Sequence, residues 1–199
     1  MSAPVAPPIL LASRSPQRRA ILEQLGIPFD VVTPPYEERD LFEAGSDPTT
    51  FVQQHARGKA RSVAGEAGDR PVLGVDTTVF LAGRVFGKPS DSADAERMLE
   101  ALAGRTHHVV SGLCLLTPAW EELHADTTSV TFRPLTARDI ARYLAADEWK
   151  ERAGAYAIQG FGASLVERID GDYLNVVGLP AALLTRLLAA RFSGIYGFG

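Results

Sequence analysis

Residues 9–25 constrain the fold of this chain more than any other stretch. The apolar run Ile9–Ala12 predicts a buried strand. Ser15 is a typical helix cap, and Pro16 suits a first helical turn because no N–H group is needed there. A helix is therefore expected to begin directly after the strand and to end before Gly26.

The turn between this strand and this helix concentrates groups that bind anions. Two hydroxyl groups and three guanidinium groups lie in it or next to it, on Ser13, Ser15, Arg14, Arg18 and Arg19. The unpaired N–H groups of a helix start and the positive end of its dipole already favour an anion at such a place. Phosphate is therefore the expected ligand, which is the first indication of a nucleotide enzyme.

Composition narrows the class of protein. The chain has 199 residues and a formal net charge of −4, so it lacks the overall basic character usual in nucleic-acid-binding proteins. We expect no nucleic-acid partner, and an anionic ligand must meet a local cluster of cations. No apolar run approaches the roughly 18 residues of a membrane helix, so no membrane span is expected either.

Cysteine usage points to a cellular compartment. Cys114 is the only cysteine, so no disulfide can form within the chain, which favours a reducing cytoplasm. It lies in an apolar run and is expected to be a buried, inert thiol. The first residues carry no basic region ahead of their short apolar run, which argues against a signal peptide.

Apolar strands and amphipathic helices alternate along the rest of the chain, which indicates an α/β fold. Periodicity and caps predict strands over residues 29–32, 71–81, 108–116 and 127–132, and helices over residues 47–64, 91–103, 136–146 and 180–190. Two more strands, 165–169 and 173–177, are expected to form a hairpin around Asp170-Gly171, a pair favoured in tight turns.

No repeat, low-complexity linker or change of composition marks a domain boundary. We therefore expect one elongated domain over residues 1–199. The tail 191–199 has no helical or strand periodicity, so both it and residues 1–8 are predicted to be loosely ordered ends.

Asp76 is a carboxylate within the most apolar predicted strand, residues 71–81. A buried carboxylate is costly unless it is paired or binds a metal. Taken alone, Asp76 is explained equally well as a strand-end residue bonded to its own turn. A hairpin around Ala82-Gly83 would return Lys88 to the same end of the sheet, however, and metal-assisted phosphoryl chemistry requires a carboxylate with an ammonium group.

Three other polar clusters have a structural explanation at least as good as a functional one. Glu37-Glu38 lie in a polar loop and suit a solvated surface. Lys59 lies in a basic run that fits a solvated helix face. The pair His107-His108 is not expected to share a metal ion, because adjacent residues on a strand point to opposite faces.

Residues 153–162 form a run of glycines and small residues around one tyrosine, Tyr156, and one glutamine, Gln159. Small residues allow the backbone to approach a flat ligand closely. The Gln159 amide can donate and accept hydrogen bonds at once, which suits the edge of a nucleobase. Alone this is weak evidence, since glycine-rich loops are common turns.

Taken together, these segments resemble the Maf family of nucleoside triphosphate pyrophosphatases, from about Ile9 to about Leu188. The form of residues 153–160 looks like the branch that acts on dTTP and UTP, whereas the branch acting on 7-methyl-GTP usually carries Ser and Glu in this loop. The matching motifs lie, in order, at residues 11–19, 37–38, 59–60, 75–77, 87–89, 104–107, 153–160, 171–173 and 177–180.

The resemblance implies a fold and a reaction. The fold would be a Maf/ITPase-like elongated mixed β-sheet flanked by helices, with a cleft between two lobes and often a homodimer. The reaction would be hydrolysis between the α- and β-phosphates, which gives a nucleoside monophosphate and pyrophosphate. A triphosphate carries about four negative charges, so cations must offset its repulsion of an attacking hydroxide.

The resemblance also assigns roles to residues of this chain. Asp76 would be the general base or a metal-orienting acid, and Glu38 would join Asp76 in binding Mg²⁺ or Mn²⁺. Phosphate binding would fall to Ser13, Arg18, Lys59 and Lys88. Substrate specificity would fall to Gln17, Thr77 and Gln159.

Two positions depart from the family pattern. Gln17 stands where members commonly have Arg, which puts a specificity role at this position in question. Arg152 stands where many members of the branch have Lys; arginine keeps the charge but presents a planar fork of donors.

Two alternatives to the prediction of a dTTP/UTP pyrophosphatase stay open. One is a pyrophosphatase for a modified purine nucleotide such as 7-methyl-GTP, and the other is a non-catalytic nucleotide sensor linked to cell division.

Overall fold

The computed structural model describes residues 6–37, 42 and 46–198, and these contain one seven-stranded mixed sheet. The strands are β1 (Ile9–Ala12), β2 (Phe29–Val32), β3 (Val72–Leu81), β4 (Arg84–Phe86), β5 (Thr106–Leu116), β6 (Glu121–Phe132) and β7 (Val166–Asp170). Their order is β2-β1-β3-β5-β6-β7, with β4 paired to β3. β1 runs parallel to β2 and β3, and the other pairings are antiparallel. The expected mixed sheet is confirmed.

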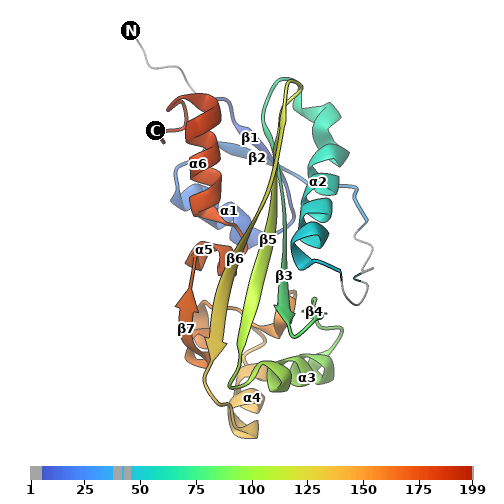
Figure 1. Cartoon of the computed structure of the whole chain (residues 1–199), viewed down its shortest axis with the longest axis vertical. Coiled ribbons are helices and arrows are strands. Elements are labelled where there is room, and N and C mark those ends of the chain that lie inside the picture. Colours follow the sequence, from blue (N-terminus) through green and yellow to red (C-terminus); the bar gives the residue numbers. More distant parts are fainter. Residues whose placement is uncertain (1–5, 38–41, 43–45, 199) are drawn as a thin grey trace.

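Helices flank this sheet along its length (Figure 1). They are α1 (Pro16–Gln24), α2 (Pro48–Ala67), α3 (Ser92–Leu102), α4 (Ala137–Leu144), α5 (Tyr173–Val177) and α6 (Ala181–Phe192), with short 3-10 helices η1 (Ala153–Ala155) and η2 (Gly160–Leu165). None of the helices in the described part of the chain is long and apolar enough to cross a membrane.

Unequal strand lengths give the molecule its elongated shape. β3, β5 and β6 have 10, 11 and 12 residues, whereas β1 and β2 have 4 each. β1 pairs only with the first part of β3, from Val72 to Gly74. Among the described residues this edge of β3 is therefore unpaired between Gly74 and Val79, where pairing with β4 begins, and the candidate functional site lies at this gap (Figure 1).

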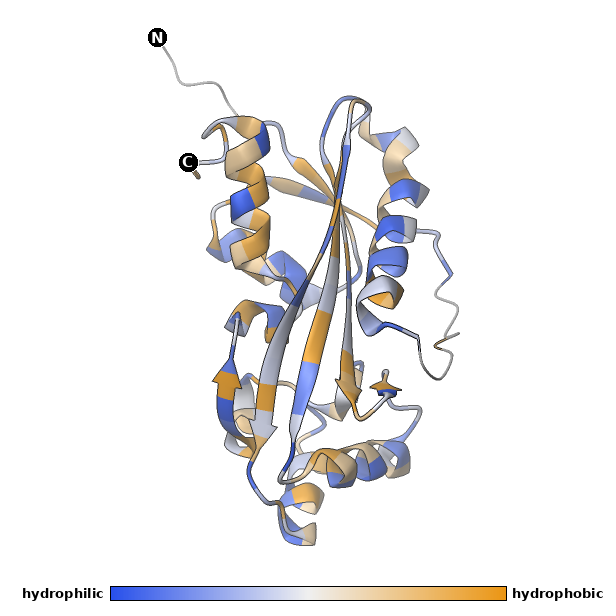
Figure 2. Ribbon diagram, viewed as in Figure 1, coloured by the Kyte–Doolittle hydropathy of each residue, from blue (hydrophilic) through white to orange (hydrophobic). Residues whose placement is uncertain are grey.

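Alternation along the strands divides the core into three clusters. At the β1 end, one cluster lies beneath α1 and α6 and includes Leu73, Val75 and Leu113. On the opposite face, a second cluster packs Val72 and Cys114 against α2. A third cluster fills the other end of the sheet around α3 and α4. Figure 2 shows the apolar residues along α6 and the central strands that form these layers.

The predicted helix starts are confirmed by their caps. The side chains of Ser15, Asp47 and Asp91 accept hydrogen bonds from backbone N–H groups of α1, α2 and α3. Thr136 and Asp139 form the reciprocal capping box expected at the start of α4. The thiol of Cys114 is buried, as predicted.

The predicted hairpin at residues 165–177 is wrong in its second half. β7 ends at Asp170, and residues 173–177 form α5 instead of a strand. Asp172 caps this helix by accepting a hydrogen bond from Leu174 N at 2.8 Å, and Gly178 ends it at φ 132°. The β-branched pair in this segment favours a strand locally, but the cap and the terminal glycine define a helical turn.

The end of the chain also differs from the loosely ordered tail that the sequence predicts. α6 continues to Phe192, and Tyr196 is only 7% exposed within the cluster beneath α6. Its hydroxyl donates a hydrogen bond to Pro7 O at 2.7 Å.

The division of the chain into domains is not decided by these elements. A single domain over residues 1–199 stays a prediction.

Candidate functional site

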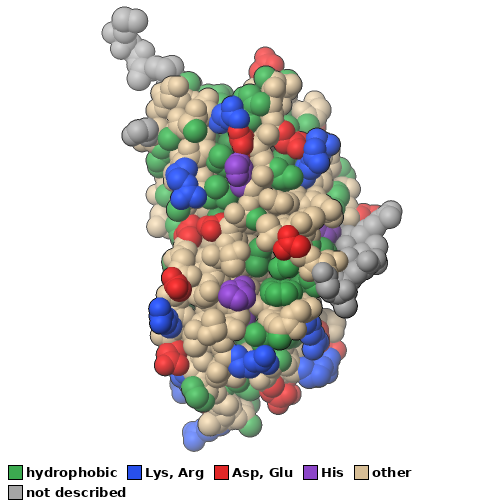
Figure 3. All heavy atoms as spheres, viewed as in Figure 1, with side chains coloured by type: hydrophobic (Ala, Val, Ile, Leu, Met, Phe, Trp, Pro, Cys, Tyr) green, Lys and Arg blue, Asp and Glu red, His purple; other side chains and the backbone are tan. Residues whose placement is uncertain are grey.

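A cavity of about 640 Å³ opens where β3 continues beyond the end of β1. The turn before α1, the middle of β3, one face of α2 and residues 150–159 contribute its walls. Its charged lining residues, among those the structure describes, are Arg14, Arg18, Lys59, Asp76, Lys88, Lys150, Glu151 and Arg152. Six cations and two carboxylates make this wall strongly basic, although the chain as a whole is acidic. On the face seen in Figure 3, by contrast, cationic and acidic side chains are interspersed.

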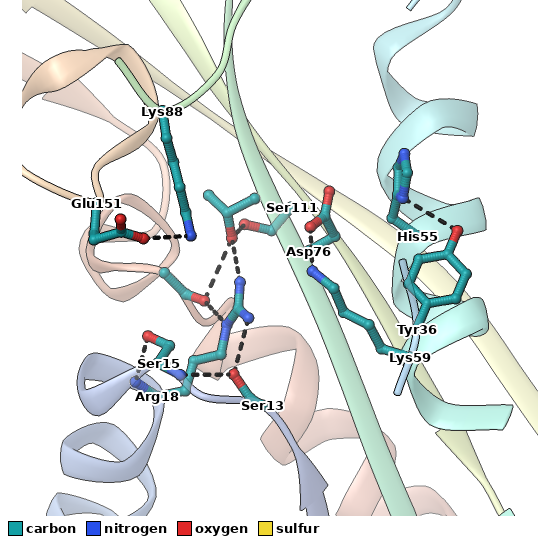
Figure 4. A network of polar contacts seen from close by, with 12 residues as sticks. Ser13, Ser15, Arg18, Tyr36, His55, Lys59, Asp76, Lys88, Ser111 and Glu151 are labelled. Atoms are coloured by element: carbon teal, nitrogen blue, oxygen red, sulfur yellow. Dashed lines mark hydrogen bonds and ion pairs between the residues drawn. The ribbon is translucent and has the colours of Figure 1, made fainter. Parts of the chain in front are cut away.

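Asp76 and Lys59 form a buried ion pair on one wall of the cavity. Lys59 Nζ lies 2.6 Å from Asp76 Oδ1, and their side chains are only 8% and 12% exposed (Figure 4). The solvated helix face suggested by the basic run around Lys59 is wrong, because the residue lies on the buried face of α2. The phosphate-binding role that the resemblance implies for Lys59 stays a prediction. The pairing explains how a carboxylate is tolerated in an apolar strand.

Two glycines let α2 approach the sheet closely enough to make this pair. A Cβ atom on Gly74 would lie 2.2 Å from Ala56 O, and one on Gly112 would lie 2.3 Å from Val52 O. Gly74 lies two residues before Asp76 on β3, and Gly112 is the β5 partner of Asp76. All three therefore face α2. Any larger residue at either glycine would push the helix that carries Lys59 away from Asp76.

Arg18 connects three segments on the opposite face of β3. Its Nε donates to Gly178 O at 2.9 Å, its Nη1 to Ser13 Oγ at 3.1 Å and its Nη2 to Thr77 Oγ1 at 3.3 Å (Figure 4). Thr77 Oγ1 also lies 2.9 Å from Ser111 Oγ. Ser13, Arg18 and Thr77 line the cavity, and this network fixes the turn before α1 beside β3.

The expected specificity residues approach the cavity from two directions. Gln17 lies in the first turn of α1, where its Oε1 accepts a hydrogen bond from Ser15 Oγ at 3.1 Å. Gln159 caps η2 without a side-chain cap bond and is exposed. Both line the main cavity and also a smaller adjoining pocket of about 160 Å³. The structure therefore brings them together at one edge of the site.

Lys88 returns to the site by the hairpin of β3 and β4, as the sequence predicts. Its Nζ lies 2.8 Å from Glu151 Oε2, in an ion pair whose side chains are 58% and 81% exposed. Lys88 and Asp76 line the same cavity, but Figure 4 shows Lys88 directed to Glu151 and not to Asp76.

A buried histidine supports the small-residue loop that carries Gln159. His107 Nε2 lies 2.9 Å from the hydroxyl of Tyr156, and His107 is fully buried. Burial, together with the nearby His108, lowers the pKa of His107 to about 4, and burial raises the pKa of Tyr156. Ala157 N donates to Tyr143 Oη at 3.0 Å, which anchors the next residue of the loop. His108 instead lies near Ser129, so the two histidines diverge as expected.

Glu38, the second expected metal ligand, lies outside the described residues. The residue that leads toward it, Tyr36, packs on α2, where its hydroxyl lies 3.2 Å from His55 Nδ1. The Tyr36 ring fills the space above Gly58, where a Cβ atom would lie 2.2 Å from ring carbon Cε2. Tyr36 and His55 line the cavity near Lys59.

Several lining residues were missed by the sequence analysis. Lys150 and Glu151 directly precede the small-residue loop, and Tyr36 directly precedes Glu37-Glu38. Proximity to these motifs was the available signal. Nothing in the sequence distinguished Glu151 from the other exposed carboxylates, because its partner Lys88 lies 63 residues away in the chain.

The arrangement combines the parts needed to act on a polyanion. A buried carboxylate is held in place by an ammonium group, and further cations and a helix N-terminus lie around the same space. The cations can offset negative charge in a ligand, and Asp76 can accept a proton from water.

Three curated relatives of this chain share one name. A dTTP/UTP pyrophosphatase of Deinococcus radiodurans is 42% identical over 199 residues, which cover 100% of both chains. Another, of Nitratidesulfovibrio vulgaris, is 46% identical over 187 residues, covering 94% of this chain and 89% of the relative. One of Pyrococcus furiosus is 41% identical over 180 residues, covering 90% and 93%.

A solved structure of a nucleoside-triphosphatase (dITP/XTP pyrophosphatase) from Mycobacterium abscessus aligns with 94% of this chain and 99% of its own. Its sequence identity of 19% and TM-score of 0.45 are too low to bear on this protein. A family model described as Maf-like protein, in contrast, matches residues 8–191. With this match and the relatives above, the chain belongs to the Maf family.

Proposed function

We propose that this protein hydrolyses the bond between the α- and β-phosphates of dTTP and UTP, giving the monophosphate and pyrophosphate. The observation that carries the proposal is the buried Asp76–Lys59 pair on the wall of a cation-rich cavity. The relatives at 41–46% identity, all named dTTP/UTP pyrophosphatase, support the choice of nucleotides.

Asp76 acts as the general base in this proposal. Lys59 holds Oδ1, so the carboxylate has a fixed orientation in which its other oxygen accepts a proton from water. The water oxygen bonds to phosphorus, the anhydride P–O bond breaks, and pyrophosphate leaves with the bonding electrons. Burial within β3 keeps Asp76 in one position throughout the reaction.

Cations hold the triphosphate in place. Lys59 and Lys88 reach the cavity from opposite walls, and Arg18 fixes the Ser13 turn where the α1 helix begins. The positive end of α1 adds to this field. Preorganised positive groups stabilise the charge that develops on the phosphate oxygens in the transition state.

A divalent cation, Mg²⁺ or Mn²⁺, completes the proposed site. Within residues 6–37, 42 and 46–198 there is no cluster of three or more His, Cys, Asp or Glu able to hold a metal. Mg²⁺ usually binds through one or two carboxylates together with substrate phosphates, however, and Asp76 fits this mode. Glu38 is the proposed second carboxylate. The cation would supply neutralisation of the phosphate charge.

Gln17, Thr77 and Gln159 are proposed to select the base. Gln17 and Gln159 line the same edge of the cavity, and the Gln159 amide suits the donor and acceptor groups of a pyrimidine. Thr77 lines the same cavity and is held by hydrogen bonds with Arg18 and Ser111.

We also propose a cytoplasmic location and a homodimer. Cys114, the only cysteine, is buried, and this burial raises the pKa of its thiol to about 12. A single cysteine cannot form a disulfide within the chain, which suits a reducing compartment. Sedimentation of the purified protein tests the homodimer.

The proposal is tested by pyrophosphate release from a panel of triphosphates that includes dTTP, UTP, 7-methyl-GTP and ITP, with Mg²⁺ or Mn²⁺. Fast, selective release from dTTP and UTP is expected, and excess chelator should abolish it. Release from a modified purine alone would keep the chemistry but overturn the assignment of Gln159. Binding without any release would favour a nucleotide sensor.

A further inference from the structure

The cation-rich cavity contains a carboxylate that the proposed reaction does not use. Among the described lining residues, Asp76 and Glu151 are the only carboxylates. Asp76 is buried and held by Lys59, whereas the Glu151 side chain is 81% exposed and is directed to Lys88 (Figure 4). The two acids therefore differ in both burial and partner.

Three cations lower the pKa of the Glu151 carboxyl group, and one of them, Lys88, contacts it directly. Lys88 Nζ lies 2.8 Å from Glu151 Oε2 and is the main cause of the lowered pKa of Glu151. Arg14, from the turn before α1, and the adjacent Arg152 lower the same pKa through their charges. In the structure the Glu151 carboxylate thus already occupies the ammonium group of Lys88, in the field of two further cations.

The backbone around Glu151 directs its side chain to this position. Glu151 adopts the left-handed conformation, with φ 59°, in the turn that leads from α4 to η1. The turn is stabilised by hydrogen bonds from Arg152 N to Trp149 O at 3.2 Å and from Trp149 Nε1 to Leu144 O at 3.1 Å. This turn therefore sets the direction in which the Glu151 side chain leaves the backbone.

We propose that Glu151 is a built-in competitor of the substrate, because its carboxylate occupies Lys88 until a phosphate group displaces it. This inference rests on the proposed function, in which Lys88 binds phosphate. Carboxylate and phosphate oxygens accept the same ammonium hydrogens, and two anions at this cluster repel each other. The exchange has a low cost, because an ion pair this exposed contributes little stability. Glu151 thereby weakens substrate binding and favours release of the pyrophosphate product.

The substitution Glu151→Gln tests this competition, with inorganic pyrophosphate as the binding probe in calorimetry. We expect the Kd for pyrophosphate to fall by about 3- to 10-fold at low salt, with a similar fall in KM for dTTP. The difference should shrink in high salt, because exposed charges are screened over about 10 Å or less. Glu100→Gln removes the same charge from an exposed position on α3, outside the cavity, and should leave Kd unchanged.

A second variant separates the effect of the Glu151 carboxylate from the effect of the left-handed backbone at this position. Glu151→Gly removes the carboxylate and suits φ 59°, so it should tighten pyrophosphate binding as Glu151→Gln does. Unchanged or weaker binding in both variants would overturn the competitor role, and weaker binding would mean that Glu151 orients Lys88 for phosphate. Absence of measurable pyrophosphate binding in every form would also contradict it.

The two proposals fail in different ways. Pyrophosphate binding requires no turnover, so tighter binding by both Glu151 variants would support the competitor even if no triphosphate were hydrolysed. Conversely, selective hydrolysis of dTTP and UTP with unchanged pyrophosphate binding in the variants would keep the proposed function and remove the competitor.

Discussion

Two lysine–carboxylate pairs lie on opposite walls of one cavity with almost the same distance and very different surroundings. Lys59 and Asp76 are 2.6 Å apart with side chains 8% and 12% exposed, and Lys88 and Glu151 are 2.8 Å apart with side chains 58% and 81% exposed. The nitrogen–oxygen distance alone would not distinguish the two ion pairs. Burial makes the first pair a fixed part of the site and the second an exchangeable contact.

Removing the cation of the buried pair should have the largest effect on stability. Lys59→Met leaves Asp76 without its ammonium partner among buried residues, so the free energy of unfolding should fall by about 3–5 kcal/mol. Urea denaturation measures this change. Lys88→Met is the matched control at the exposed pair, where a loss of less than about 1 kcal/mol is expected. Equal losses in the two variants would contradict the distinction.

Removing the acid of the buried pair should have the largest effect on activity. Asp76→Asn keeps the shape of the side chain but removes the proton acceptor, so we expect kcat to fall by several hundredfold or more. Circular dichroism should show an intact fold. Near-normal turnover of dTTP by this variant would exclude Asp76 as the base.

A third buried polar group, His107, should make the stability of the protein depend on pH. Burial lowers the pKa of His107 to about 4 from its ordinary 6.5, so the folded protein holds it neutral. Between pH 6.5 and pH 4 the unfolded chain binds a proton that the folded chain does not, and stability should decrease as pH falls through this window, by at most about 3 kcal/mol. His107→Gln should make the decrease shallower in thermal melts at each pH. An unaltered pH dependence would show that other groups control acid stability.

The smallest effect is expected at the exposed pair. A double-mutant cycle of Lys88→Met and Glu151→Gln should give a coupling energy of about 0.5 kcal/mol or less in denaturation. A coupling energy of several kcal/mol would mean that this contact is not exchangeable.

The difference between the pairs also explains what the sequence could predict. Asp76 was identifiable because a carboxylate within an apolar strand requires a partner. Its partner Lys59 was not, although Val52, Ala56 and Val63 place that lysine on the same helical face. A lysine surrounded by arginines in sequence suits a solvated face, and only the close contact of α2 with the sheet reverses this.

Local signals failed where tertiary contacts decide the outcome. The strand expected at residues 173–177 became α5 because Asp172 and Gly178 define a helical turn. β6 begins at Glu121, six residues before the strand expected from apolar alternation, because pairing with β5 extends through polar residues. Caps and the strand-to-helix turn at α1 were predicted correctly, since each depends on neighbouring residues only.

The glycines beneath α2 have a consequence for mutational tolerance. Gly74 and Gly112 touch no substrate in the proposed reaction, yet each leaves no room for a Cβ atom against the helix backbone. In a screen of every single substitution, we expect both positions to be as intolerant as Asp76 itself. Neighbouring positions that face the same helix, such as Cys114, should accept small replacements. A map of loss of function would therefore extend along the line where helix and sheet meet, well outside the cavity.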